Sequence, residues 1–158
     1  MSVSIKPMWI LGARALACAL LLGLSTAAAK RPLAFKGAQG AGRYSSGGRG
    51  GKILRVTNLN DDGAGSLREA VEAKFPRIIT FDVAGTIRLK SPMVIRHPRI
   101  TINGQDAPAG GIALADNGLV VSTDDVVVRY IRSRLGDISR VEADAIVGYG
   151  QDDRLVLA

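Results

Sequence analysis

The sequence predicts an all-β fold in which short parallel strands wind into a solenoid, a parallel β-helix. Three observations favour it. Short β-branched runs recur from residue 78 onward, Gly, Pro, Asn or Asp bounds each run, and corresponding runs begin about 22 to 26 residues apart. One solenoid coil holding several short strands has this length. An antiparallel β-sandwich is the competing interpretation, although it requires closer turn signals.

The expected strands are all short. They are Ile53–Val56, Ile78–Phe81, Thr86–Leu89, Met93–Ile95, Ile100–Ile102, Ile112–Leu114, Leu119–Val121, Val126–Ile131, Ala145–Val147 and Leu155–Leu157. Ile78, Ile100 and Val126 begin three successive corresponding runs. The interval between Ile100 and Val126 is repeated between Leu119 and Ala145. Repetition at a fixed interval indicates stacked coils.

One helix is expected between the first two strands. Ser66 is a suitable N-cap residue, and Glu69 three positions later completes a capping box. Apolar or small side chains follow until Pro76, so the helix should span Leu67–Lys74. The stretch 37–51 contains seven glycines and must be an irregular loop, either flexible or closely packed. Together the loop and the helix would cover the exposed end of the first coil.

The N-terminal segment, 1–29, is typical of a secretory signal peptide. Lys6 and Arg14 are basic, Ala15–Leu24 is apolar, and Ala27–Ala29 offers small residues for cleavage before Lys30. A retained membrane helix would need an apolar run of about 20 residues. We therefore expect secretion, to the extracellular space or periplasm, without membrane association after cleavage.

The remaining segment, 30–158, is expected to form one β-helix domain. It contains no cysteine, because Cys18 lies in the signal, and this excludes disulfides and a cysteine nucleophile. Removing Lys6 and Arg14 lowers the formal charge from +7 to +5, which favours acidic partners. Aromatic residues make up only 4% of the chain and do not interleave with a basic run, so no nucleic-acid partner is expected.

Several sequence blocks resemble one known family. They are Ala34–Tyr44, the GGRGGK run that ends at Lys52, Val56–Asp61, Gly65–Ala70, Phe81–Ile87, Thr101–Pro108 and Val128–Arg132. In these blocks, which occur in the family's order, the chain resembles the N-terminal half of bacterial pectate lyases. The resemblance implies a right-handed parallel β-helix with a capped N-terminal end. Because the last residues look like the start of a strand, we expect the solenoid to be incomplete at its C-terminus.

The resemblance also implies a reaction, the cleavage of α-1,4-linked galacturonan by calcium-assisted β-elimination. The family's first calcium carboxylates match Asp144 and, less closely, Glu142 in the element Glu142–Ile146. Residues two apart in a strand project to the same side, so both carboxylates would face one Ca²⁺ ion. Asp137 is a more distant candidate. The alternative is a solvated acidic pair beside a turn.

Arg132 and Arg134 are the expected substrate-binding residues. A guanidinium suits a uronate carboxylate, and in a continuous strand these two side chains share a face that Arg129 does not. They would otherwise simply stack along the solenoid surface. The family's catalytic base is an arginine on a later coil, which we expect beyond Ala158. The catalytic residue is therefore unassigned, and we expect this chain alone to be weakly active or inactive.

The sequence also indicates several turn residues and leaves three alternative functions. Asn58, Asn60, Asp61 and Asn103 match architectural positions of the family and are interpreted as turn residues. The protein is expected to be a monomer. The main alternative function is a non-catalytic β-helix that binds acidic polysaccharide. A hydrolase would need paired carboxylates, but the neighbours in Asp124–Asp125 and in Asp152–Asp153 point to opposite faces if extended. An adhesive or structural surface protein is a third possibility.

Overall fold

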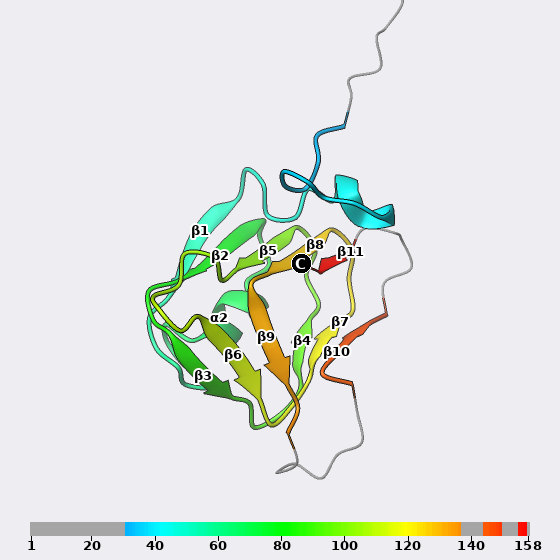
Figure 1. The fold of residues 1–158 in the computed structure, drawn as a ribbon. Helices are drawn as coiled ribbons and strands as arrows, with labels where there is room; N and C mark the ends of the chain where they lie inside the picture. Colours follow the sequence, from blue (N-terminus) through cyan, green and yellow to red (C-terminus); the bar gives the residue numbers. More distant parts are fainter. Residues whose placement is uncertain (1–30, 137–143, 150–154, 158) are drawn as a thin grey trace, which may run out of the picture. The chain divides into compact units, whose positions relative to one another are not determined.

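The strands of the chain form three parallel sheets that share one apolar interior (Figure 1). The computed structural model describes residues 31–136 and 144–149, together with the strand backbone at 155–157. The strands are β1 (Lys52–Val56), β2 (Arg77–Phe81), β3 (Gly85–Arg88), β4 (Met93–Ile95), β5 (Ile100–Asn103), β6 (Ile112–Ala115), β7 (Leu119–Val121), β8 (Val126–Arg129), β9 (Ile131–Arg134), β10 (Ile146–Gly148) and β11 (Leu155–Leu157). The helices are the 3₁₀ turn η1 (Ala41–Tyr44) and the α-helix α2 (Leu67–Glu72).

Each full coil of the solenoid contributes one strand to each sheet. The first coil comprises β2, β3 and β4, the second β5, β6 and β7, and the third β8, β9 and β10. The five-stranded sheet has the order β1-β2-β5-β8-β11, and two three-stranded sheets have the orders β3-β6-β9 and β10-β7-β4. The strand pairings in the described part are all parallel. Parallel pairing of strands about one coil apart confirms the solenoid and excludes the antiparallel sandwich.

The interior is built from apolar side chains that stack from coil to coil. Ile79 pairs with Ile102, which pairs with Val128, and all three are buried. The same stacking joins Met93 to Leu119 in the β4–β7–β10 sheet. Alternate residues of a strand face opposite sides, so β-branched and long aliphatic residues at every second position fill the space between the sheets.

Helix α2 lies against the first coil and contacts β1, β2 and β4. The hydroxyl of Ser66 accepts a hydrogen bond from the Glu69 amide at 3.2 Å, which confirms the predicted N-cap. The Glu69 carboxylate, however, accepts from the Gly65 amide rather than from Ser66, so the capping box is shifted by one residue. The helix buries Leu67, Ala70 and Val71 and ends at Glu72, two residues before the predicted end.

A buried arginine completes this end of the solenoid. Arg77 is inaccessible to solvent, and its guanidinium donates to the carbonyl oxygens of Ala70 at 3.1 Å, Val71 at 2.5 Å and Phe75 at 3.2 Å. These carbonyls lie at or just after the end of α2, where backbone acceptors lack helical partners. Burial lowers the pKa of the Arg77 guanidinium from its usual value. Arg77 therefore ties the covering helix to the first coil.

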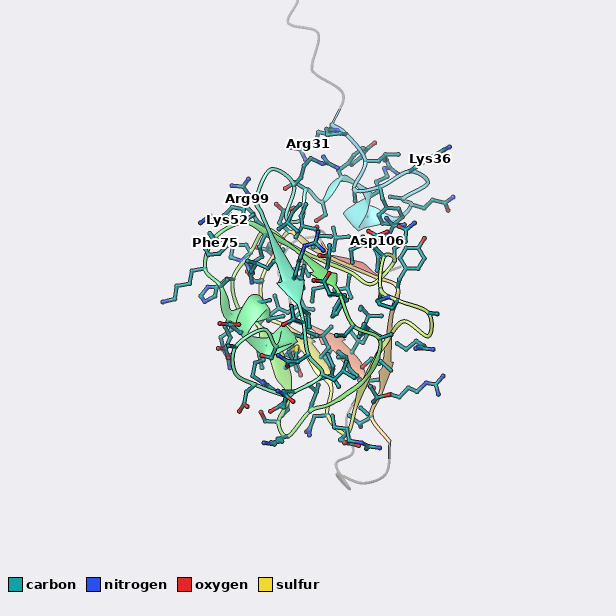
Figure 2. The ribbon with its side chains drawn as sticks, turned by 90° about the vertical axis from the view of Figure 1, so that its left-hand side faces the viewer. Arg31, Lys36, Lys52, Phe75, Arg99 and Asp106 are labelled. Atoms are coloured by element: carbon teal, nitrogen blue, oxygen red, sulfur yellow. The ribbon has the colours of Figure 1, made fainter. Side chains whose placement is uncertain are left out.

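The outer side of the edge strand β1 is exposed to solvent. Ile53 is 64% exposed. The Lys52 ammonium group lies 4.9 Å from the centroid of the Phe75 ring, and Figure 2 shows these two residues near each other. A basic side chain on an edge strand is a common means of discouraging pairing with another sheet.

The predicted strand Val126–Ile131 is wrong in one respect. The chain bends at Tyr130, so this run is divided between β8 in the five-stranded sheet and β9 in the β3–β6–β9 sheet. Tyr130 has a φ of 56°, in the left-handed region. The run contains no glycine or proline that would have indicated this bend.

The sequence also predicted a signal peptide and no retained membrane helix. The predicted signal peptide at 1–29 lies outside the described residues and stays a prediction. Within the described ranges, no helix has both the length and the apolar character required to cross a membrane.

Candidate basic face

The outer face of the β3–β6–β9 sheet carries three arginines in two rows. Strand register places Thr86, Ala113 and Arg132 in one row, and Arg88, Ala115 and Arg134 in the next. Thr86 and the three arginines are exposed, and the two alanines between them are small. The result is a low, cationic surface, which we call the basic face.

The guanidiniums of the basic face have different partners. Arg88 lies 3.1 Å from the Asp116 carboxylate in an ion pair whose arginine side chain is 66% exposed. Arg132 donates a hydrogen bond to the Gly110 carbonyl oxygen. In the ranges that the structure describes, Arg132 and Arg134 form no ion pair with an acidic side chain. A guanidinium has five N–H donors, so Arg132 keeps most of its donors for a ligand.

The bend at Tyr130 determines which arginines share this face. Residues up to Arg129 belong to the five-stranded sheet, whereas Arg132 and Arg134 follow the bend and lie two apart on β9. Gly104 permits the bend, because a Cβ at this position would overlap the carbonyl oxygen of Tyr130. The prediction that Arg132 and Arg134 share a side without Arg129 is therefore confirmed, but the cause is a change of sheet.

Arg129 serves the fold rather than the basic face. Its guanidinium lies 3.9 Å from the ring centroid of Phe35 and 4.9 Å from that of Tyr130. Stacking of this kind is typical of arginine and holds Phe35, which precedes the glycine-rich loop, against the coil that contains β8 and β9. The Arg129 Nε atom is buried and has no hydrogen-bond partner among the described residues.

Asp144 lies two residues before β10, the strand that follows β9 in the sequence. It is exposed, and its backbone carbonyl would be 2.7 Å from a Cβ added at Gly118, so the glycine lets the third coil approach the second. Ser133 between the two arginines donates to the Ala145 carbonyl at 2.7 Å. This hydrogen bond ties the backbone beside Asp144 to β9.

Of the three carboxylates predicted as calcium ligands, Asp144 lies among the described residues. Glu142 and Asp137 lie outside the described residues, so their position relative to Asp144 stays a prediction. Across 31–136 and 144–149, no group of three or more His, Cys, Asp or Glu side chains comes together as a metal site would require. The chemistry of Asp144 fits a single hard oxygen ligand for Ca²⁺, an ion that takes about six to eight oxygens in all.

Asp125 has a role that the sequence analysis missed. Its carboxylate accepts hydrogen bonds from the Ser45 hydroxyl at 3.0 Å, from the Ser46 amide and hydroxyl at 2.7 and 2.5 Å, and from the Gly47 amide at 3.3 Å. Burial alone would raise the pKa of Asp125, but these hydrogen bonds outweigh burial and leave the pKa below its usual value. Asp125 thus anchors the glycine-rich loop to the start of β8.

The turn residues behave as predicted. The Asn58 side chain donates to Ala64 at 2.8 Å and accepts from the Asn60 amide at 3.1 Å, and Asp61 forms a 2.6 Å ion pair with Arg68. The Asn103 side chain accepts from the Gln105 amide at 3.3 Å. These contacts are local and architectural.

Comparison with known proteins gives a consistent result. No protein-family model matches the chain. A protein from Aspergillus terreus named "Probable pectate lyase C" is 49% identical over 115 residues, which are 72% of this chain and 27% of that protein. Proteins with the same name from Aspergillus fumigatus and Emericella nidulans are 45% identical over 125 residues and 50% identical over 105 residues.

These identities are high, but the matched region is limited. The three alignments cover 66% to 78% of this chain and 24% to 29% of the relatives. The resemblance to pectate lyases that the sequence blocks indicated is confirmed, together with the parallel solenoid that it implied. The chain is a homologue of the probable pectate lyases and spans 24% to 29% of their length.

Proposed function

We propose that this chain is part of a secreted lyase that acts on an acidic polysaccharide of the pectate type, and that the basic face binds the substrate carboxylates. The observation that carries the proposal is the basic face itself, on a chain homologous to probable pectate lyases. Arg132 and Arg134 are exposed, lie two apart on one strand, and have no acidic partner among the described residues. Carboxylates are the natural ligands of such guanidiniums.

Small residues beside the arginines support binding of an extended chain. Ala113 and Ala115 occupy the positions that pair with Arg132 and Arg134. Because neither alanine projects far from the sheet, a polymer is able to lie along β9 with its carboxylates near both guanidiniums. The positive balance of the whole chain would also attract a polyanion over a longer range.

Calcium is part of the proposal through Asp144 and Glu142. Asp144 is exposed just before β10, so it would be one hard ligand, and Glu142 is proposed as a second. When bound, calcium would neutralise a substrate carboxylate and so favour removal of the neighbouring proton. Arg132 and Arg134 would hold adjacent carboxylates and orient the substrate. We assign no general base among the described residues.

The first test is a measurement of product. The purified chain is incubated with polygalacturonate, with calcium and with a chelator, and the ultraviolet absorbance of the unsaturated uronide is followed. A calcium-dependent rise would establish lyase activity in this chain. Arg134→Gln should then reduce the rate, and Arg55→Gln, an exposed arginine on the edge strand β1, serves as the matched control.

A binding measurement separates the main alternative. If folded protein sediments with polygalacturonate but produces no unsaturated ends, the chain is a non-catalytic, polysaccharide-binding relative or only the binding part of an enzyme. If it neither binds nor cleaves the polymer in either buffer, the proposal fails.

A further inference from the structure

We propose that the groove beside Tyr130 is a separate subsite for one uronate unit, with the Tyr130 ring as a stacking platform and Arg132 as its charged anchor. The groove lies where the chain bends into β9, at the start of the basic face. This inference rests on the proposed function, because it names where a further sugar of the same acidic polysaccharide would bind.

The conformation of Tyr130 is the first observation. A bulky residue with a φ of 56° is uncommon, since glycine or asparagine usually occupies such a position. The corresponding residue one coil earlier is Gly104, which directly follows Asn103, the partner of Arg129. The bend therefore does not require a tyrosine, and the ring is not part of the core, because the residue is 52% exposed.

The ring is nevertheless held in place. The Arg129 guanidinium lies 4.9 Å from its centroid and donates to its hydroxyl at 3.3 Å, and Phe35 stacks on the same guanidinium at 3.9 Å. An aromatic ring that is fixed yet exposed loses little entropy when a ligand stacks on it. The apolar C–H face of a sugar ring is a suitable ligand for such a surface.

The second observation is the groove itself. It is an open, partly apolar hollow of about 510 Å³ between the turn that follows β5 and the start of β9. Its lining includes Gly104, Pro108, Gly110, Tyr130 and Arg132. Asp106, labelled in Figure 2, belongs to the same turn but does not line the groove. Arg132 is therefore the charged side chain of the lining, which favours an anion.

The groove and the basic face are continuous. Arg132 lines the groove and is also the first arginine of β9 on the basic face, and Arg134 follows about 7 Å further along the strand. The Arg132 contact with the Gly110 carbonyl holds its guanidinium at the groove rim. One polyanion would thus contact Tyr130, Arg132 and Arg134 in that order.

The test measures the binding of trigalacturonate to the purified chain by calorimetry, in calcium and in chelator. Tyr130→Asn removes the ring but suits the left-handed backbone, and Tyr130→Phe keeps the ring. Tyr149→Asn is the matched control, because Tyr149 is 69% exposed and lies beside β10, away from the groove lining. Circular dichroism and thermal unfolding show whether each variant is folded.

We expect Tyr130→Asn to weaken binding about fivefold, as the loss of one stacking contact would, and Tyr130→Phe and Tyr149→Asn to bind like the unchanged chain. If the unchanged chain binds and folded Tyr130→Asn binds equally well, the subsite is wrong while the proposed function stands. Equal weakening by Tyr130→Asn and Tyr149→Asn would also overturn it. If the unchanged chain does not bind at all in either buffer, the proposed function fails together with the subsite.

Discussion

The outer face of the five-stranded sheet around Thr101 and Val127, which we call the covered face, lies under the chain's own glycine-rich loop, whereas the outer face of the β3–β6–β9 sheet carries exposed arginines. Both faces come from the same parallel ladder, with one outward residue at every second position. On the covered face, Gly48 and Gly51 bring backbone against backbone, and Gly47 lies against the side chains of Thr101 and Val127. Thr101 also accepts a hydrogen bond from the Gly48 amide at 2.9 Å.

The difference teaches what makes a solenoid face structural or available to a ligand. On the covered face Thr101 accepts a hydrogen bond from the loop, and the short side chain of Val127 is buried beneath it. Outward residues on the basic face are long cations separated by alanines, which gives a covering loop little to pack against. Substitutions at outward positions should therefore change stability on the covered face and ligand binding on the basic face.

The largest effect is expected from Gly48→Ala. A Cβ at Gly48 would overlap the carbonyl group of Arg77, so the loop must move away from the sheet. We expect the free energy of unfolding to fall by about 3 kcal/mol, measured by urea denaturation. Gly50→Ala is the control: its φ is 75° and nothing lies within 4 Å of the added Cβ. Backbone strain alone should cost about 1 kcal/mol there, and equal losses would contradict the close packing.

Asp125→Asn should give the next largest effect. The carboxylate accepts four hydrogen bonds from the loop, and the amide keeps only one acceptor oxygen. Asparagine tolerates the φ of 59° at this position, so the change isolates the charge and the lost acceptor. We expect a loss of about 2 kcal/mol in the free energy of unfolding. Asp106→Asn, on an exposed turn, should change it little.

The same anchor should make stability depend on pH. Because the folded-state pKa of Asp125 lies below its usual value, its contribution is present above the unfolded pKa of about 4 and is lost as the pH falls through the folded pKa. Acidification should therefore destabilise the unchanged chain more than Asp125→Asn. Parallel losses in both proteins, followed by urea denaturation from about pH 6 to pH 3, would mean that another group is responsible.

A smaller effect is expected from one substitution made on both faces. Thr101→Val removes the acceptor for the Gly48 amide and should cost about 1 kcal/mol. Thr86→Val makes the same change at an exposed outward position of β3 and should alter the free energy of unfolding by less than about 0.5 kcal/mol. If the two losses are equal, the faces do not differ in the way described.

The repeated coils were predictable from the sequence because burial follows a local pattern. Strands such as Met93–Ile95 and Leu119–Val121 were located to the residue, since each is a short apolar run between turn residues. The Ser66 cap was equally local. Arg132 and Arg134 were placed on one face correctly, because residues two apart in a strand share a side.

What the sequence did not reveal depends on long-range contacts. The bend at Tyr130 lies inside the predicted strand Val126–Ile131, which contains no glycine or proline. It is permitted by Gly104, which belongs to the preceding coil. Arg77 begins an apolar run as a charged residue, and only the carbonyls at the end of α2 explain its burial. Asp125 was considered only as half of an acidic pair, because its partners lie far away in the sequence, in the glycine-rich loop.

The smallest effect is expected from a change on the basic face itself. Arg134→Gln removes one exposed cation without disturbing a described ion pair, so the free energy of unfolding should not change measurably. Binding to polygalacturonate should weaken about threefold and depend less on salt, because a rim charge acts mainly through a screened, long-range attraction. Arg55→Gln, which removes the same charge from β1, controls for net charge. If both variants weaken binding equally, the polymer responds to the total charge of the chain rather than to this face.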